Sequence, residues 1–205
     1  MDHQTVNYYS ENAISVAARY EAVVSNLSAS FKVSFRPNSK LLDIGCGSGR
    51  DLALLARLGH NCFGLDATPE FVELSQTLHP ELKGKIVDGA LPTFDPPFGG
   101  QFDGILCSAV LMHISEEQLV PAAVSIRKCL KQNGRLLYSV PCKRLDVIAE
   151  NRDANGRLFI PDQSDRLQTI FEQLDFSLIS KWVNSDSLGR DSVEWISVLM
   201  ELKVD

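Results

Sequence analysis

Three glycines at alternate positions, Gly45, Gly47 and Gly49, follow a short apolar run in the segment LLDIGCGSGR, residues 41–50. A glycine lacks a Cβ atom, so a ligand can come close to the backbone of such a turn. A helix that begins behind the turn presents free N–H groups and the positive end of its dipole. Open α/β sheets bind nucleotides in this way, and the alternative is a tight strand-to-helix turn without a ligand.

The residues around these glycines argue against a dinucleotide. The dinucleotide-binding motif is GxGxxG, whereas here Arg50 stands at the position of the last glycine. Asp43 lies in the apolar run, just before the turn. A carboxylate at that position attracts a cationic ligand and repels a pyrophosphate. The segment therefore agrees with a ligand that carries a positive charge.

Acidic residues also stand at the ends of the next two apolar runs. Asp66 ends the run CFGLD, where a carboxylate can accept hydrogen bonds from both hydroxyls of a ribose. Asp88, Gly89 and Ala90 end the following run, where the carboxylate can accept an exocyclic amine and the backbone can contact a purine edge. Each acid alone is more often a solvated strand end. Three acids at successive strand ends instead predict one shared crevice.

A histidine beyond the next apolar run is the candidate general base. His113 lies five positions past Ser108, which ends the run FDGILCS. Imidazole ordinarily titrates near neutral pH, so His113 could take a proton from a hydroxyl or amine. The alternative role is packing against a ligand or capping the next helix.

Four further residues are candidates for substrate contacts, each with a structural alternative. Tyr8 and Tyr9 either close over the ligand or anchor the first helix. Arg50 either binds a carboxylate or is a solvated first-turn residue. Arg190 either binds an anionic substrate group or sits at an exposed hairpin tip.

The elements that position these residues alternate between strand and helix. We expect helices in the first 35 residues and over 51–59, from Thr68-Pro69, from about Pro121 to Gly134, and over 164–174. The last two strands form a hairpin, so one of them runs against the others. The pattern predicts a doubly wound, seven-stranded, mostly parallel sheet with the last strand antiparallel. Its strands are expected at residues 41–45, 62–66, 85–89, 102–108, 135–140, 176–183 and 193–202.

Composition narrows the class of protein. The 205 residues fit a single domain, 1–205, and they contain no apolar stretch long enough to span a membrane and no secretory signal pattern. Five cysteines occur without a CxxC pair, so we expect reduced thiols, no metal site and a cytoplasmic location. The net charge of −6 disfavours a nucleic-acid partner, although a local basic face is compatible with it.

Five segments resemble the motifs of class I S-adenosylmethionine-dependent methyltransferases. The likeness covers residues 40–140 well and extends more weakly to the ends, where NYYSENA and LGRDSVEW resemble small stand-alone bacterial members. Gln132-Asn133 departs from the Pro-Gly of many members, but asparagine tolerates the left-handed conformation of such a turn. The segments are LLDIGCGSGR, GLDATPEFVELS, VDGALPTF, FDGILCSAVLMHI and LKQNGRLLYSV.

The resemblance implies a Rossmann-like methyltransferase fold that binds S-adenosylmethionine. By this likeness residues 1–36 form an N-terminal helical lid, and residues 141–161 form an irregular insertion on the substrate side. Ser108 would line the cofactor, and Leu111 would cover its adenine or sulfonium. Asp43, Gly45, Gly47 and Gly49 would hold the methionine part, Asp66 the ribose, and Asp88, Gly89 and Ala90 the adenine.

The implied activity is methyl transfer to an O, N or S nucleophile, and we expect a small-molecule acceptor. One alternative is a tRNA or protein methyltransferase. A nucleotide-dependent oxidoreductase is opposed by the GxGxG spacing and by the lack of a hydride-transfer signature. A non-catalytic cofactor-binding module is opposed by the intact acids and glycines. In the tRNA or protein alternative, a local basic face would be formed by Lys143, Arg144, Arg152 and Arg157.

Overall fold

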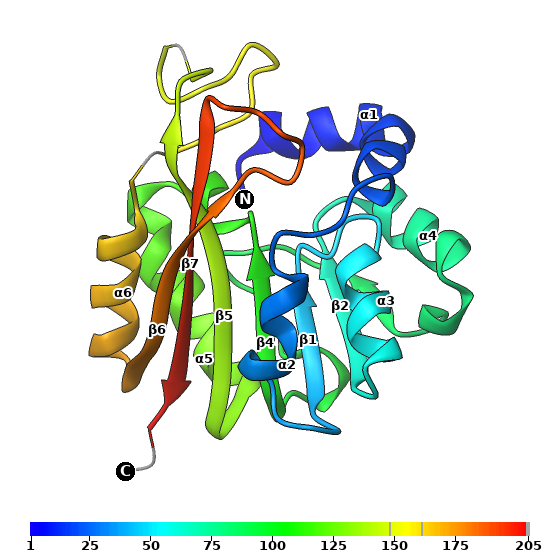
Figure 1. The fold of residues 1–205 in the computed structure, drawn as a ribbon, viewed down its shortest axis with the longest axis vertical. Coiled ribbons are helices and arrows are strands. Elements are labelled where there is room, and N and C mark those ends of the chain that lie inside the picture. Colours follow the sequence, from blue (N-terminus) through cyan, green and yellow to red (C-terminus); the bar gives the residue numbers. More distant parts are fainter. Residues whose placement is uncertain (148, 161, 204–205) are drawn as a thin grey trace.

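The computed structural model describes residues 1–147, 149–160 and 162–203. These residues form a seven-stranded sheet in the order β3-β2-β1-β4-β5-β7-β6 (Figure 1). Strand β7 is antiparallel to both neighbours, which confirms the predicted sheet. The strands are β1 Lys40–Ile44, β2 Asn61–Asp66, β3 Ile86–Asp88, β4 Phe102–Ser108, β5 Leu130–Arg144, β6 Phe176–Ser185 and β7 Val193–Leu202.

Helices cover both faces of the sheet, as the alternating pattern predicts. Two separate apolar clusters result, because parallel strands bury side chains on both sides. One cluster packs Leu119 and Phe171, from α5 and α6, against the sheet. The other packs Phe31 and Leu52, from α2 and α3, against the opposite face. The helices are α1 His3–Glu21, α2 Phe31–Ser34, α3 Arg50–Arg57, α4 Pro69–Leu78, α5 Leu119–Cys129 and α6 Ser164–Gln173.

The chain winds outward in both directions from the boundary between β1 and β4. Strand β1 pairs in parallel with β2 on one side and with β4 on the other. In open α/β sheets the crevice outside the carboxyl ends of two such strands is where ligands bind. Helix α1 lies across this end of the sheet (Figure 1). No helix in the described ranges is long and apolar enough to cross a membrane.

The predicted end of the helix from about Pro121 to Gly134 is wrong. Helix α5 begins at Leu119 and ends at Cys129, so it does not continue to Gly134. Pro121 lies in its first turn, where a missing N–H costs no hydrogen bond. The chain turns instead through Asn133, whose φ is 60°, and β5 already begins at Leu130. The apolar pattern around residue 130 fits a buried strand as well as a helix end, and periodicity does not separate the two.

Residues 149–160 lie beyond the end of β5 and pack against α1. Both terminal nitrogens of Arg152 bind the carboxylate of Asp2, at 3.0 and 2.9 Å, and the Leu158 N–H donates to Thr5 Oγ1 at 2.9 Å. The start of α1 and this segment therefore form one cover. Residues 148 and 161 of the expected insertion 141–161, and residues 204–205 of the expected domain, lie outside the described residues.

Candidate functional site

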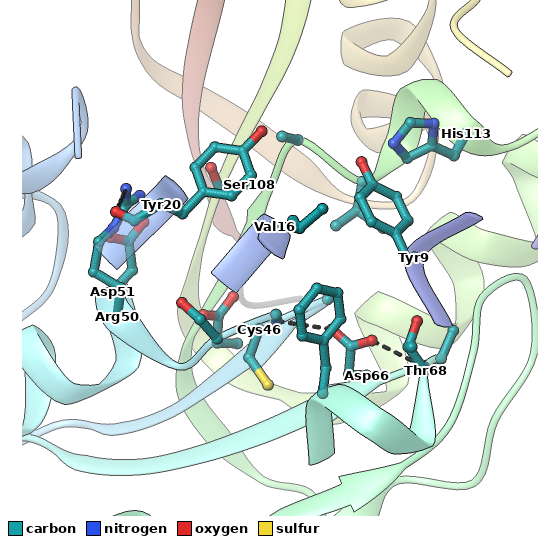
Figure 2. Close-up of a pocket in the computed structure, with 18 of the residues that line it drawn as sticks. Tyr9, Val16, Tyr20, Cys46, Arg50, Asp51, Asp66, Thr68, Ser108 and His113 are labelled. Atoms are coloured by element: carbon teal, nitrogen blue, oxygen red, sulfur yellow. Dashed lines mark hydrogen bonds and ion pairs between the residues drawn. The ribbon is translucent and has the colours of Figure 1, made fainter. Parts of the chain in front are cut away.

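A pocket lies beneath α1 at the carboxyl ends of the central strands (Figure 2). Its wall on one side comes from α1, through Tyr9, Val16 and Tyr20. Its floor comes from the turn after β1 and the end of β2, and the loop after β4 and the β6–β7 connection complete it. The pocket therefore lies in the crevice where the sequence places Asp43, Gly45, Gly47 and Asp66.

The three glycines of the turn all have left-handed backbone angles, but for different reasons. A Cβ atom on Gly47, with φ of 54°, would meet nothing within 4 Å, so this glycine opens onto the pocket. A Cβ on Gly45 would overlap the Val110 side chain. A Cβ on Gly49 would lie 3.2 Å from His79. Gly45 and Gly47 line the pocket, whereas Gly49 lies outside its lining and allows close packing against the segment after α4.

The pocket floor is acidic. Asp43 and Asp66 line it and are only 3 % and 6 % exposed. The Asp66 carboxylate accepts the N–H of Gly47 at 2.7 Å and the N–H of Thr68 at 2.9 Å (Figure 2). Among the described residues, none donates a hydrogen bond to the Asp43 carboxylate. Because Asp43 lines the pocket, its carboxylate is available to a ligand there.

The electrostatics of this floor favour a cation. Burial raises the pKa of Asp43 well above its usual range, and the nearby charges of Asp51 and Asp66 raise it further. Burial also raises the pKa of Asp66 to about 6, although the hydrogen bonds from its two backbone donors act to lower it. Such shifts mean that the surrounding protein does not supply enough positive charge or hydrogen bonding to stabilise the ionised carboxylates. A positively charged ligand above the floor would supply it.

Arg50 lines the pocket and ties the glycine turn to the end of α1. Its Nε donates to Asp51 Oδ1 at 2.9 Å, and its Nη1 donates to the Tyr20 carbonyl at 3.0 Å. Ser48, in the turn itself, donates to Glu21 Oε1 at 2.6 Å. The carboxyl end of α1 is thereby fixed to the pocket floor, and Arg50 is a pocket residue with a defined orientation rather than a solvated one.

His113 lies at the opposite edge of the pocket from Arg50, beside Tyr9 (Figure 2). It belongs to a single 3-10 turn, Leu111–His113, and is 3 % exposed. Its Nδ1 lies 2.5 Å from the Leu158 carbonyl oxygen. A carbonyl oxygen only accepts, so Nδ1 carries the hydrogen and Nε2 carries the lone pair. Nε2 is buried and has no partner among the described residues.

The surroundings of His113 make it less basic than an exposed imidazole. Burial lowers its pKa to about 4, with the charges of Arg157 and Arg144 acting in the same direction. The hydrogen bond to the Leu158 carbonyl opposes this shift without outweighing it. His113 is therefore neutral at physiological pH and is a weaker base than a free imidazole.

Of the two tyrosines only Tyr9 lines the pocket. Its hydroxyl accepts a hydrogen bond from Arg157 Nη1 at 3.2 Å, and burial raises its pKa to about 12. Tyr8 packs edge-on against the Tyr9 ring and beneath the Arg157 guanidinium, 4.5 Å from its ring centre. Tyr8 therefore anchors the first helix, which is the structural alternative for this residue.

Arg190 does not line the pocket, contrary to the expected substrate contact. Its Nε and Nη2 each bind one carboxylate oxygen of Asp186 at 2.8 Å. Trp195 Nε1 donates to the same carboxylate at 3.0 Å. Asp186 and Trp195 do line the pocket, and sequence reasoning missed both. The signal was the four-residue spacing of Asp186 and Arg190, which suits a paired carboxylate better than a free cation.

The loop after β4 contributes differently from the expectation. Ser108 lines the pocket, and its hydroxyl lies 3.2 Å from that of Ser139 on β5. Leu111 is fully buried in the apolar core and lies outside the pocket lining. Ala109 and Val110 take that place, because Ala109 turns the chain with a φ of 58°.

The end of β3 lies beside the enclosed pocket rather than in it. Asp88 is exposed, and Asp88, Gly89 and Ala90 are all outside the pocket lining. Strand β3 is at the edge of the sheet, and the Gly89 N–H donates to the Asp66 carbonyl at 2.9 Å. A ligand that reached these residues would extend from the floor past Asp66.

The basic residues around the insertion are paired with acids. The closest contacts are 3.5 Å for Lys143 with Glu194 and 2.8 Å for Arg144 with Asp146. They are 2.9 Å for Arg152 with Asp2 and 2.6 Å for Arg157 with Asp153. Ion pairs therefore neutralise the local basic face that the tRNA or protein alternative requires.

Residues 42–138 match the model of a family described as "Methyltransferase domain". Two curated relatives are ubiquinone biosynthesis O-methyltransferases. The mitochondrial protein of Schizosaccharomyces pombe is 35 % identical over 52 % of this chain and 39 % of its own length. That of Erwinia tasmaniensis is 30 % identical over 60 % of this chain and 58 % of its own length. The matched part thus spans between a third and two thirds of these relatives.

Solved structures share the fold over the whole chain. The 1,6-didemethyltoxoflavin-N1-methyltransferase of Burkholderia thailandensis superposes with a TM-score of 0.71 at 19 % identity, and the match covers 100 % of this chain and 91 % of that protein. Its structure holds 1,6-didemethyltoxoflavin and S-adenosylhomocysteine. Residues 42–138 of this chain are therefore similar to a methyltransferase domain, and the chain shares the fold of a solved methyltransferase.

Proposed function

We propose that this protein is an S-adenosylmethionine-dependent methyltransferase that acts on a small molecule. The observation that carries the proposal is the buried Asp43 carboxylate, which lacks a hydrogen-bond donor among the described residues and lies in the same pocket floor as the open side of Gly47. S-adenosylmethionine brings two positive charges, on its sulfonium and its amino group. The acidic floor offers what such a ligand needs, and the family match points to the same ligand.

The cofactor residues follow from the pocket floor. Asp43, Gly45 and Gly47 would hold the methionine part, with Arg50 near its carboxylate. The Asp66 carboxylate uses one lone pair on each oxygen for a backbone N–H, so the others remain for ribose hydroxyls. When bound, the cofactor supplies a methyl group on a good leaving group. The adenine would then extend past Asp66 along Asp88, Gly89 and Ala90, with Ser108 on the other side.

The acceptor side supports a small molecule. Helix α1 and the segment 149–160 cover the pocket, and the basic residues of the segment are committed to ion pairs. Two relatives are named O-methyltransferases for ubiquinone biosynthesis, and the structural neighbour is named an N1-methyltransferase. An oxygen or nitrogen nucleophile on a small organic acceptor is consistent with all three names.

We also place the protein in the cytoplasm. All five cysteines, Cys46, Cys62, Cys107, Cys129 and Cys142, are free thiols. Burial raises the pKa of Cys46 and Cys107 well above the usual range, so these thiols stay protonated at neutral pH. Unpaired cysteines in this number suit a reducing compartment.

Isothermal calorimetry tests the proposal. Titration with S-adenosylmethionine or S-adenosylhomocysteine should give a dissociation constant in the micromolar range, about −7 to −8 kcal/mol. The Asp43→Asn variant, which keeps the shape of the side chain and removes its charge, should bind the charged cofactor at least tenfold more weakly. Absence of heat with either cofactor, together with tight binding of NAD, would overturn the proposed function.

A further inference from the structure

The structure contains a chain of hydrogen bonds that runs from the start of α1 to His113. Arg152 holds the Asp2 carboxylate, which accepts the Thr5 hydroxyl at 2.7 Å. Thr5 Oγ1 in turn accepts the Leu158 N–H at 2.9 Å. The carbonyl of the same residue, Leu158, accepts the Nδ1 hydrogen of His113. The backbone of Leu158 therefore connects the cover of the pocket to the histidine in its wall.

This series of hydrogen bonds fixes a single tautomer of His113. A neutral imidazole carries its hydrogen on one nitrogen only, and the partner of the other nitrogen decides which. Because the Leu158 carbonyl occupies Nδ1, the bare Nε2 is left as an acceptor. It is buried, has no partner in the described part of the chain, and belongs to a residue that lines the pocket. A buried acceptor in this condition costs stability until a donor reaches it.

We infer that the acceptor substrate presents a hydroxyl or N–H hydrogen to Nε2 of His113, and that Thr5 is a positioning residue for this contact. The inference rests on the proposed function, which it extends to the substrate class. Acceptors of this class are alcohols, phenols, amines and ring N–H groups. Thioethers and tertiary amines, whose nucleophilic atoms carry no hydrogen, lie outside it.

The chemistry suits a neutral and weakly basic histidine. As the bond between the methyl carbon and the nucleophile forms, the carbon–sulfur bond breaks and its electron pair stays on sulfur. The hydrogen on the nucleophile becomes strongly acidic at that moment, so it passes to the lone pair of Nε2. The imidazolium then releases the proton to water after the product leaves. Because the proton moves late, His113 does not need to ionise the acceptor beforehand.

Nitrogen NMR of protein labelled at histidine tests the tautomer without any methyl transfer. The sequence has four histidines, and the His113→Asn variant assigns the signal of interest. With S-adenosylhomocysteine bound, His113 should show a protonated Nδ1 and a bare Nε2. Phenol, added as a probe with an O–H, should shift the Nε2 signal, whereas anisole should not. A protonated Nε2, or equal shifts with both probes, would overturn the inference.

Thr5 variants separate positioning from general stability. Thr5→Val keeps the shape of the side chain but removes the oxygen that holds Leu158, so His113 should become a mixture of tautomers. Thr5→Ser restores the oxygen and should restore the single tautomer. An unchanged His113 signal in folded Thr5→Val protein would contradict the role of Thr5.

Turnover gives an independent readout. His113→Asn should lower methylation of a phenol about a hundredfold, but should lower methylation of pyridine, which has no N–H, less than tenfold. Equal losses on both acceptors would overturn the inference while leaving the proposed function intact. A protein that binds neither S-adenosylmethionine nor S-adenosylhomocysteine would instead contradict the proposed function.

Discussion

The Asp66 carboxylate accepts the backbone N–H of Gly47 at a distance of 2.7 Å. This bond joins the end of β2 to the glycine turn after β1, which is 19 residues earlier in the chain. The residue expected to hold the ribose thus also holds the turn expected to hold the methionine part. Cofactor binding and local stability are therefore coupled at Asp66.

Replacing Asp66 with alanine should affect both properties. Affinity for S-adenosylhomocysteine should fall at least tenfold, because the hydroxyl hydrogen bonds to a charged acceptor are lost. The free energy of unfolding of the apo protein should fall by about 1–3 kcal/mol, because the N–H groups of Gly47 and Thr68 lose their acceptor. Calorimetry and urea unfolding measure the two effects. An affinity equal to that of the wild type would place the ribose elsewhere.

The raised pKa of Asp66 predicts a dependence of stability on pH. Burial raises this pKa from 3.8 to about 6, so between these values the folded protein binds more protons than the unfolded chain. The free energy of unfolding should therefore decrease as pH rises from about 4 to 6, by up to about 3 kcal/mol for this group. Urea unfolding of wild type and Asp66→Asn at each pH isolates the contribution. The free energy of unfolding of the wild type minus that of Asp66→Asn should fall over this window. A rise in this difference would refute the assignment.

A side chain at residue 47 should prevent cofactor binding but should still allow the protein to fold. Gly47→Val places a branched side chain in the open side of the turn and should abolish cofactor binding. Gly84→Val is the matched control, because Gly84 also has a left-handed φ of 75° with nothing within 4 Å of its Cβ position, and it lies outside the pocket lining. Each variant should lose about 1–2 kcal/mol of stability. Retained binding in Gly47→Val would contradict the assigned loop.

Arg190 should matter for the integrity of Asp186. The Asp186 side chain is 4 % exposed and receives both arms of Arg190. Arg190→Gln leaves this carboxylate without its charged partner and should lower the free energy of unfolding at pH 7 by about 1–3 kcal/mol. The Arg190→Gln, Asp186→Asn double variant should recover much of that loss. Additive losses in the double variant would show that the pair is not coupled.

The central strands and the pocket floor were predictable because their signals are local. Asp43, Gly47 and Asp66 each follow directly from a strand end, and parallel strand ends meet at one edge of the sheet. The state of His113 was not predictable, because it depends on the Leu158 carbonyl, 45 residues further along the chain. The end of α5 depended on a backbone turn that composition and periodicity do not encode, whereas the four-residue spacing of Asp186 and Arg190 did signal their pairing.

A crystal structure of the complex with S-adenosylhomocysteine tests the central claim most directly. The amino group of the ligand should lie within hydrogen-bond distance of the Asp43 carboxylate, and the ribose hydroxyls should reach Asp66. The sulfur should then face the side of the pocket that holds His113. Density for the ligand outside this pocket, or a ligand whose amino group avoids Asp43, would contradict the account.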